Sequence, residues 1–269
     1  MPKNILNEKY NLLRPIKTNA LVRLGRNMVG GYIVDLDIVE KTDILVTFGF
    51  GPEWSFESEF LKIKENSKVV IYDHGLTIIP YFKEIWKYLR RFLMFRASFN
   101  SLKERYKNLK NYQNFFKQKN VKHYKEKIIY PLKGNNCADL SKVISRLNDN
   151  SKIVLKIDIQ NNEYQIINQI VEQSNQINLL IIQFYWIDKN ESIFIESIKK
   201  LKTKYEIIHI HANNHHDKLD NGLPKMLEIT FCNKKFTPNI VGYCNNFPNK
   251  ELDFSSHPSK QDISFSFRD

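Results

Sequence analysis

The stretch VLKIDIQNNEYQII, residues 154 to 167, decides the fold. It begins as an apolar run typical of a buried strand, becomes polar after Asp158, and resumes at Tyr164 with the spacing of an amphipathic helix. A carboxylate therefore stands where a strand gives way to a helix. In an open α/β sheet this edge, at the carboxyl ends of the strands, is where ligands bind.

The same transition from strand to helix recurs along the chain from residue 44 onward. Apolar runs alternate with helix-like segments, and the runs include ILVTFGF (44–50), KVVIYDHG (68–75), EKIIYPL (126–132), LLIIQFYWI (179–187), YEIIHIHANN (205–214) and KMLEITFCN (225–233). Continuous apolar strands separated by helices are typical of a parallel sheet covered on both faces. The sequence predicts a doubly wound α/β fold in one domain over residues 1–269.

Two segments fall outside this alternation. Residues 1–40 include a Gly-Gly pair, Gly30 and Gly31, which predicts a tight turn before a short strand, and we expect this segment to form an N-terminal cap. Residues 78–119 are rich in basic and aromatic side chains and too long for a standard crossover. We expect them to form one or two helices that project near the ligand-binding edge.

The composition of the chain limits which partners and which cellular compartment we expect. A formal net charge of +12 favours anionic partners, although Lys, Asn and Ile are abundant everywhere, so the charge also fits a general compositional bias. The three cysteines lack metal-ligand or disulfide spacing, and no stretch approaches the length of a membrane span. We therefore expect a cytoplasmic protein without a structural metal or a transmembrane segment.

The turn after the first core strand is a candidate ligand site. Gly49 and Gly51 permit close approach of a ligand to the backbone, although such a pair also occurs in plain tight turns. Glu53 and Glu57 follow at the start of the helix, where their negative charges would repel a phosphate. The pattern therefore favours a ligand that carries an ammonium or sulfonium charge.

The second core strand ends in Asp73, followed by His74. An acidic residue about 22 to 24 positions after the Gly pair is placed to accept hydrogen bonds from a ribose. The alternative is an aspartate that only caps a helix or stabilises a turn. Together with the Gly turn, Asp73 favours an adenosyl ligand.

Asp158 and two histidines supply candidate catalytic groups. Asp158 either faces the ligand cleft or caps the helix that begins near Asn162. His209 and His211 project to one side of their strand by period-two alternation, and a histidine suits proton abstraction near neutral pH. We expect one functional and one buried histidine rather than a metal pair.

Several ordered segments resemble the FkbM-type S-adenosylmethionine-dependent O-methyltransferases, particularly those with a GGY-containing cap. They lie between residues 22 and 254, and they are RLGRNMVGGYIV, TFGFGPEWSFE, VVIYDHG, VLKIDIQNNEY, IIHIHANN, LPKMLEITF and NNFPNKELDF. The resemblance implies a Rossmann-like class I methyltransferase fold, a mostly parallel seven-stranded sheet whose last strand, KMLEITF, runs antiparallel.

The chain departs from the family pattern at acidic positions. Val29 replaces an aspartate before the GGY, Gln160 and Asn161 replace an acidic residue and a glycine, and Gln183 stands where an acid is common. These losses count against a metal-assisted mechanism, and the need for a divalent ion stays open. Asp158, His209 and His211 are left as the expected catalytic residues.

The resemblance implies S-adenosylmethionine as methyl donor and a sugar hydroxyl as acceptor, on a nucleotide-activated sugar of bacterial surface-polysaccharide biosynthesis. We expect the donor to contact Phe48, Gly49, Phe50, Gly51, Asp73, His74 and Asp158. We expect the anionic acceptor to contact Arg90, Arg91, Asn213 and Asn214, with His211 as general base and Asp158 orienting the hydroxyl.

Two alternatives stay open. One alternative to the sugar O-methyltransferase is an RNA methyltransferase that uses its basic, aromatic segment for stacking. The other is a non-catalytic, donor-binding peripheral membrane protein whose Tyr81–Phe95 stretch lies on anionic lipid. No RNA-binding module is recognisable, so we expect no nucleic-acid partner.

Overall fold

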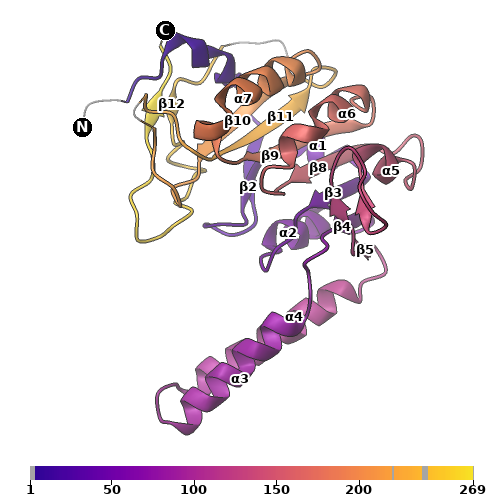
Figure 1. Ribbon diagram of the computed structural model, residues 1–269, viewed down its shortest axis with the longest axis vertical. Coiled ribbons are helices and arrows are strands. Elements are labelled where there is room, and N and C mark those ends of the chain that lie inside the picture. The colour runs from indigo at the N-terminus through magenta and orange to yellow at the C-terminus, as the bar shows by residue number, and fades with distance from the viewer. Residues whose placement is uncertain (1–3, 220, 238–241, 269) are drawn as a thin grey trace.

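The computed structural model describes residues 4–219, 221–237 and 242–268. Its centre is a seven-stranded sheet in the order β10-β11-β9-β8-β3-β4-β5 (Figure 1). The strands are β3 (Ile44–Phe48), β4 (Lys68–Tyr72), β5 (Val121–Tyr124), β8 (Ile153–Ile157), β9 (Ile177–Phe184), β10 (Tyr205–Ala212) and β11 (Leu227–Asn233). Neighbouring strands are parallel except β11, which is antiparallel to both β9 and β10. The predicted Rossmann-like architecture, a mostly parallel seven-stranded sheet with an antiparallel last strand, is confirmed.

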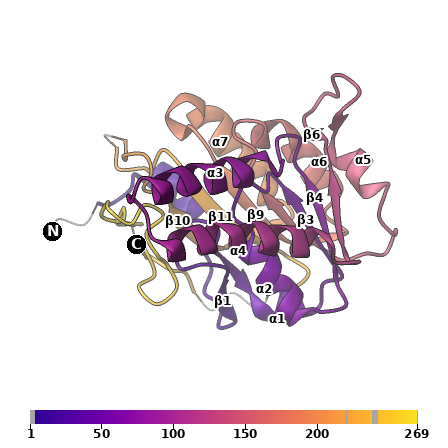
Figure 2. The same ribbon diagram turned by 90° about the horizontal axis from the view of Figure 1, so that it is seen from below.

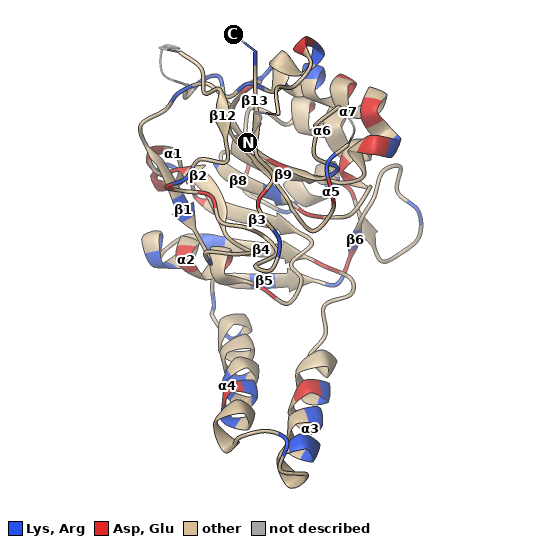
Figure 3. Cartoon of the chain, turned by 90° about the vertical axis from the view of Figure 1, so that its left-hand side faces the viewer, with Lys and Arg blue, Asp and Glu red and all other residues tan. Residues whose placement is uncertain are grey.

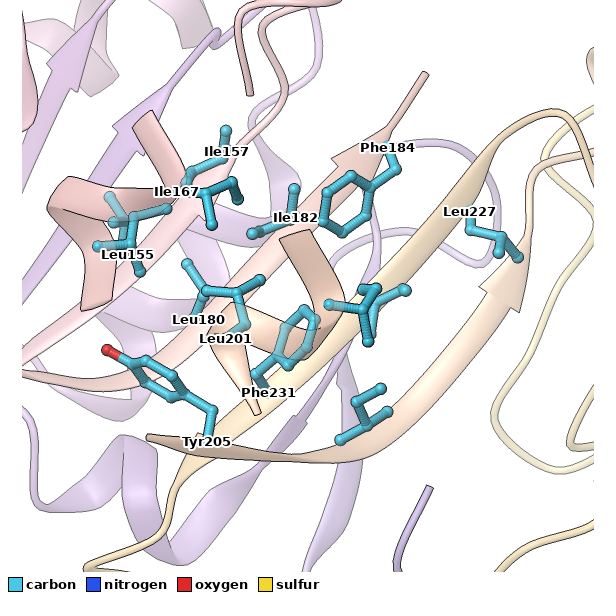
Figure 4. Close-up of a cluster of buried hydrophobic side chains, with 14 of the residues drawn as sticks. Leu155, Ile157, Ile167, Leu180, Ile182, Phe184, Leu201, Tyr205, Leu227 and Phe231 are labelled. Carbon is cyan, nitrogen blue, oxygen red and sulfur yellow. The ribbon is translucent and has the colours of Figure 1, made fainter. Parts of the chain in front are cut away.

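Helices cover both faces of this sheet. The helices of the described residues are η1 (Glu8–Leu13), α1 (Leu36–Glu40), α2 (Ser55–Ile63), α3 (Ile79–Leu93), α4 (Phe99–Phe116), α5 (Leu140–Ile144), η2 (Glu163–Ile166), α6 (Ile167–Glu172) and α7 (Ile187–Leu201), and all but α3 take part in this cover or border it. Side chains of η1, α5, α6 and α7 pack on one face, and side chains of α1, α2 and the end of α4 pack on the other. Figure 4 shows part of the first cluster, where Leu180 and Ile182 of β9 lie near Phe231 of β11.

The central strands are largely apolar because both of their faces are covered. Every residue of β3, β8 and β9 is buried. A buried strand of this kind has no solvent face to hold polar residues, so its sequence is a continuous apolar run. This is why the strands nearest the site were recognisable in the sequence.

The prediction of a core strand at EKIIYPL (126–132) is wrong. The third strand of the parallel half is β5, at the edge of the sheet, and only Val121 of its four residues is buried. An exposed edge strand carries no apolar run, so the pattern pointed to the next apolar residues instead. Lys127–Ile128 (β6) pairs with Cys137–Ala138 (β7) in a separate two-stranded sheet.

The N-terminal segment, described from residue 4, contributes an antiparallel hairpin of β1 (Leu21–Leu24) and β2 (Tyr32–Asp35). All four residues of β2 are buried against the main sheet, and Thr230 donates a hydrogen bond to the carbonyl oxygen of Ile33 at 2.7 Å. The C-terminal segment adds a second small sheet, β12 (Asn246–Phe247) with β13 (Phe265–Ser266).

Helices α3 and α4 form an antiparallel hairpin that stands clear of the rest of the molecule (Figures 1 and 3). No residue of α3 is buried, and in α4 the buried residues are Leu109, Tyr112 and Phe115, near its C-terminal end. Viewed from below, the two helices run side by side (Figure 2). Among the described residues, no helix combines the length and the apolarity needed to span a membrane.

Candidate active site

The loop after β3 crosses very close to the loop after β8. The N–H of Asp158 donates to the carbonyl oxygen of Phe48 at 2.8 Å, and the N–H of Gly49 donates to that of Tyr72 at 3.0 Å. Gly49 has a φ of +75°, and a β-carbon there would stand 1.9 Å from the carbonyl oxygen of Asp158. Only glycine fits this crossing without a backbone shift.

Asp73 fixes the turn that follows Gly49. Its Oδ2 accepts hydrogen bonds from the N–H groups of Phe50 at 3.0 Å and Gly51 at 3.2 Å, and its Oδ1 accepts one from Gly75 at 2.8 Å. The turn-stabilising alternative for Asp73 is therefore real. A carboxylate has about four acceptor sites, so Asp73 keeps capacity for one more donor such as a ribose hydroxyl.

A cavity of about 380 Å³ opens between the ends of β3, β4 and β8, within the usual size range for small-molecule sites. Its walls include the carboxylates of Asp73, Glu126 and Asp158, together with the exposed His74. The hydrogen bond from Arg146 is the main cause that lowers the pKa of Glu126 to about 2, so this carboxylate is already paired. Asp73 and Asp158 are left to make the cavity attractive to a cation.

Phe48 and Phe50, expected beside the donor, are not among the residues that line the cavity. The Phe48 ring lies in the core, and the Phe50 ring packs with Trp54 and Phe115. Gly51 has a φ of +64°, and a β-carbon added there would meet no atom within 4 Å, so its surface is open to a ligand.

The Asp158 carboxylate faces the ligand edge and accepts a hydrogen bond from the Tyr185 hydroxyl. Tyr185 is held in turn, because its N–H donates to Oε1 of the buried Glu163 at 2.9 Å. Helix η2 begins after Asn162, and the Asp158 side chain does not provide its cap. The helix-cap alternative for Asp158 is therefore wrong.

Burial raises the pKa of Asp158 above its usual value. Lys156 and the Tyr185 hydrogen bond oppose this by stabilising the carboxylate, but the net shift is upward. Lys156 is committed to a fully buried ion pair with Glu57, at 2.9 Å. Glu57 therefore points into the sheet and not at a ligand, in contrast to the expectation from the sequence. The raised pKa of the Asp158 carboxylate suits it to proton abstraction.

A row of polar side chains runs from Asp158 across the neighbouring strands, and we call it the polar row. Strand pairing sets Gln183 opposite Glu228, and Glu228 opposite His211. Asp158 lies beside Gln183, since the preceding residues of the two strands are paired. With about 4.8 Å between strands, Asp158 and His211 are roughly 14 Å apart in the backbone. The geometry does not bring them together at one hydroxyl.

Both histidines contact carboxylates of the C-terminal segment instead. His209 Nε2 lies 3.2 Å from Asp253 Oδ1, and His211 Nε2 lies 3.2 Å from Asp262 Oδ2. Burial lowers the pKa of His211, but the hydrogen bond with Asp262 and the nearby carboxylates raise it, and the net result is above its ordinary value. The two pairs hold the C-terminal segment over β10. No cluster of three potential metal ligands occurs among the described residues.

Glu228 is a site residue that sequence reasoning missed. It is almost fully buried, and burial raises its pKa to about 7, while the charges of His211 and Arg23 oppose that shift. Arg23 comes from β1 and donates to the carbonyl oxygens of Met28 and Leu252, so it joins the cap to the C-terminal segment. Only strand pairing reveals that Glu228 lies in line with Asp158.

Asn213 and Asn214 are buried and already bonded within the chain. Asn213 Oδ1 accepts from the N–H of His215 at 3.0 Å, and Asn214 Oδ1 accepts from the N–H of His257 at 2.7 Å. Asn214 Nδ2 also donates to Ser255 Oγ at 2.7 Å. These contacts give both asparagines a role in holding loops rather than the expected contact with an acceptor.

Arg90 and Arg91 lie in the last turn of α3, far along the hairpin. Within the described part of the chain, neither side chain lines the cavity beside Asp158 or a second cavity of about 390 Å³ at the hairpin base. The basic residue at that second cavity is Arg105, and Tyr81 also lines it. The expected contact of Arg90 and Arg91 with an acceptor beside Asp158 is not supported.

No protein-family model and no curated protein matches this chain. Among solved structures it is similar to a chain of a fibrillarin/Nop5p complex, with 10% identity, a TM-score of 0.39, and coverage of 71% of this chain and 72% of that one. It is also similar to precorrin-6y C5,15-methyltransferase from Geobacter metallireducens, with 9% identity, a TM-score of 0.37, and coverage of 73% and 84%.

A third similar structure is a dimethyladenosine transferase from Plasmodium falciparum, with 11% identity, a TM-score of 0.38, and coverage of 74% of this chain and 61% of that one. Similarities this distant transfer neither a substrate nor an activity to the present chain.

Proposed function

We propose that the protein is an S-adenosylmethionine-dependent O-methyltransferase. The observation that carries the proposal is the cavity at the ends of β3, β4 and β8, where Asp73 and Asp158 outweigh Lys127 and leave a net negative lining. A sulfonium cation is favoured in such a lining, whereas the phosphates of a nucleotide are repelled. When bound, the donor supplies an electrophilic methyl group.

The residues present fit this donor. Asp73 has an acceptor site left for a ribose hydroxyl, and the Gly49–Gly51 turn lets a ligand approach the backbone. His74 is exposed on the cavity wall beside Asp73. Asp158 follows β8, beside the Gly49 turn and across β3 from Asp73 and His74.

We assign the acceptor proton to Asp158. Its carboxylate is at the cavity, its pKa is raised by burial, and the Tyr185 hydroxyl fixes its orientation. In methyl transfer to a hydroxyl the protein supplies alignment and a base, and Asp158 provides the base. His211 lies on β10, an edge strand of the sheet, and is hydrogen-bonded to Asp262. We assign it the role of positioning the C-terminal segment.

The acceptor we propose is a sugar hydroxyl, on a nucleotide-activated sugar of bacterial surface-polysaccharide biosynthesis. The FkbM-type resemblance supports this class. Gln183 and Glu228 continue the polar row from Asp158, but both are buried and neither lines the cavity, so the row itself does not select the acceptor.

Calorimetric titration with S-adenosylhomocysteine tests the donor site. Asp73→Ala should weaken binding strongly, because the Phe50 and Gly51 N–H groups lose their acceptor along with the ribose contact. Asp43→Ala is the matched control, since Asp43 also accepts a backbone N–H, from Lys152, at the opposite edge of the sheet. Equal affinity in wild type and Asp73→Ala would reject this donor site.

A turnover screen tests the acceptor class. Release of S-adenosylhomocysteine is measured against a panel of nucleotide-linked sugars, with and without magnesium or a chelator. Turnover with one of them supports the proposed acceptor, and its dependence on the chelator decides the need for a metal. Donor binding without turnover on any sugar would leave the donor site standing and reject the acceptor class.

A further inference from the structure

The tip of the α3–α4 hairpin exposes a set of large apolar side chains. Phe95 is 99% exposed, Leu93 is 68% exposed and Phe99 is 63% exposed, and Met94 lies between the first two. They are consecutive or nearly so around the turn that joins the helices. Single exposed apolar residues are common on protein surfaces, but a contiguous group at the end of a projecting arm marks an interaction site.

The same hairpin carries most of the net positive charge of the chain. Residues 79–119 contain eleven Lys or Arg and two Glu, a net charge of +9, against +12 for all 269 residues. Figure 3 shows these basic residues in blue along both helices. A general compositional bias would spread the charge evenly, so its concentration here points to an anionic partner for this arm.

The charges and the apolar side chains are arranged in layers along the hairpin. Arg90, Arg91 and Arg96 lie within about one helical turn, roughly 5 Å, of the apolar tip. Trp86, which is 63% exposed, lies about two turns back from the tip. The apolar tip followed by the basic residues matches the order of the acyl and headgroup layers of a bilayer.

We propose that this hairpin docks the protein on an anionic bilayer, with residues 92–95 and Phe99 inserted shallowly and the arginines at the lipid headgroups. The inference rests on the hairpin alone and does not depend on the proposed methyl transfer. RNA fits the surface less well, because bases stack on aromatic rings, and Leu93 and Met94, both exposed at the tip, offer none. A second copy fits less well because the like charges of two such arms repel.

Docking would fix the candidate active site near the membrane. Helix α3 begins six positions after Asp73, and a helix of its 15 residues is about 22 Å long. The donor cavity is therefore held roughly one helix length from the headgroups. An acceptor presented at the membrane surface lies within reach of that edge.

Vesicle flotation tests the proposal with the full chain. Wild type should float with vesicles of phosphatidylcholine and phosphatidylserine, bind phosphatidylcholine alone far more weakly, and lose binding as salt rises. Leu93→Ser with Phe95→Ser should lower the partition at least about tenfold through lost apolar burial. Arg90→Glu with Arg91→Glu should lower it similarly at low salt.

Matched controls separate the arm from the rest of the surface. Ile193→Ser removes an apolar side chain that is 51% exposed on α7, and Lys199→Glu with Lys204→Glu reverses two exposed charges near the end of α7. Both controls should float like wild type. Because no residue of α3 is buried, its variants should fold, which thermal unfolding verifies.

Two results would overturn the proposal. One is equal flotation of the arm variants and the controls. The other is no vesicle binding by wild type, together with either binding of single-stranded RNA or concentration-dependent dimerisation in sedimentation that the arm variants abolish. Since S-adenosylhomocysteine titration reports the donor site separately, failure of membrane binding leaves the proposed function intact.

Discussion

The carbonyl oxygen of Asp158 occupies the space that a β-carbon on Gly49 would need, at a separation of 1.9 Å. We predict that Gly49→Ala moves the β3 and β8 loops apart and abolishes donor binding. The expected loss of stability exceeds the roughly 1–2 kcal/mol that a left-handed backbone alone costs a non-glycine residue. Urea unfolding and calorimetric titration measure the two effects.

Gly134→Ala is the control for backbone strain. Gly134 has a φ of +89° and no atom within 4 Å of the β-carbon position, so it shares the conformation of Gly49 without the crowding. If both variants lose the same free energy of unfolding, the close approach of Gly49 to the Asp158 carbonyl oxygen adds nothing to the cost of the left-handed backbone.

Asp158→Asn should lower kcat by roughly 100- to 10,000-fold, the usual contribution of a general base, while donor affinity survives. The wild-type rate should fall as the pH drops through the Asp158 pKa, which burial places above the ordinary aspartate range. Steady-state rates across pH measure this. A normal kcat in Asp158→Asn would remove Asp158 from the chemistry.

Tyr185→Phe separates positioning from catalysis. The Tyr185 hydroxyl stabilises the ionised form of Asp158, so its loss should raise the Asp158 pKa further. The acid limb of the rate profile should then move to higher pH, with a smaller loss of kcat at alkaline pH. An unchanged limb would mean that the hydrogen bond does not form in the working enzyme.

His211→Gln should leave kcat unchanged and loosen the C-terminal segment. The pKa of His211 is raised in the folded state, so its contribution to stability is complete below its unfolded pKa and is lost as pH rises through its folded pKa. Wild type should therefore protect residues 253–262 from proteolysis better near pH 6 than near pH 8. A sharp loss of kcat in His211→Gln would restore the histidine as a catalytic candidate.

Glu163→Gln should stabilise the protein at alkaline pH. Burial raises the pKa of Glu163 to about 7, so folding favours its protonated form and stability falls as pH rises toward and through 7. Glutamine keeps the acceptor for the Tyr185 N–H without the buried charge. The gain should be at most about 3 kcal/mol at pH 8 and vanish near pH 4, measured by urea unfolding.

The sequence was informative where local pattern and burial coincide. The strands ending at Phe48, Tyr72 and Ile157 are covered on both faces, so their apolar runs located the sheet and placed Gly49, Asp73 and Asp158 at its ligand edge. Strand β5 lies at the margin of the sheet with mixed exposure, and its pattern carried no comparable signal.

The histidine partners were beyond local pattern. Asp253 and Asp262 follow His209 and His211 by more than 40 residues, in a segment with little regular structure, and no periodicity predicts which carboxylate meets which ring. Glu228 was missed for a related reason, because strand register, which local pattern does not give, sets it beside Gln183 and His211.

The hairpin adds few contacts to the body, since α3 is wholly uncovered and α4 is anchored through its last turns. Both ends of the arm return to adjacent strands, β4 and β5. Evolution can therefore lengthen, shorten or exchange the arm without remodelling the sheet. In that sense the arm and the sheet are separable parts of the chain, joined at one crossover.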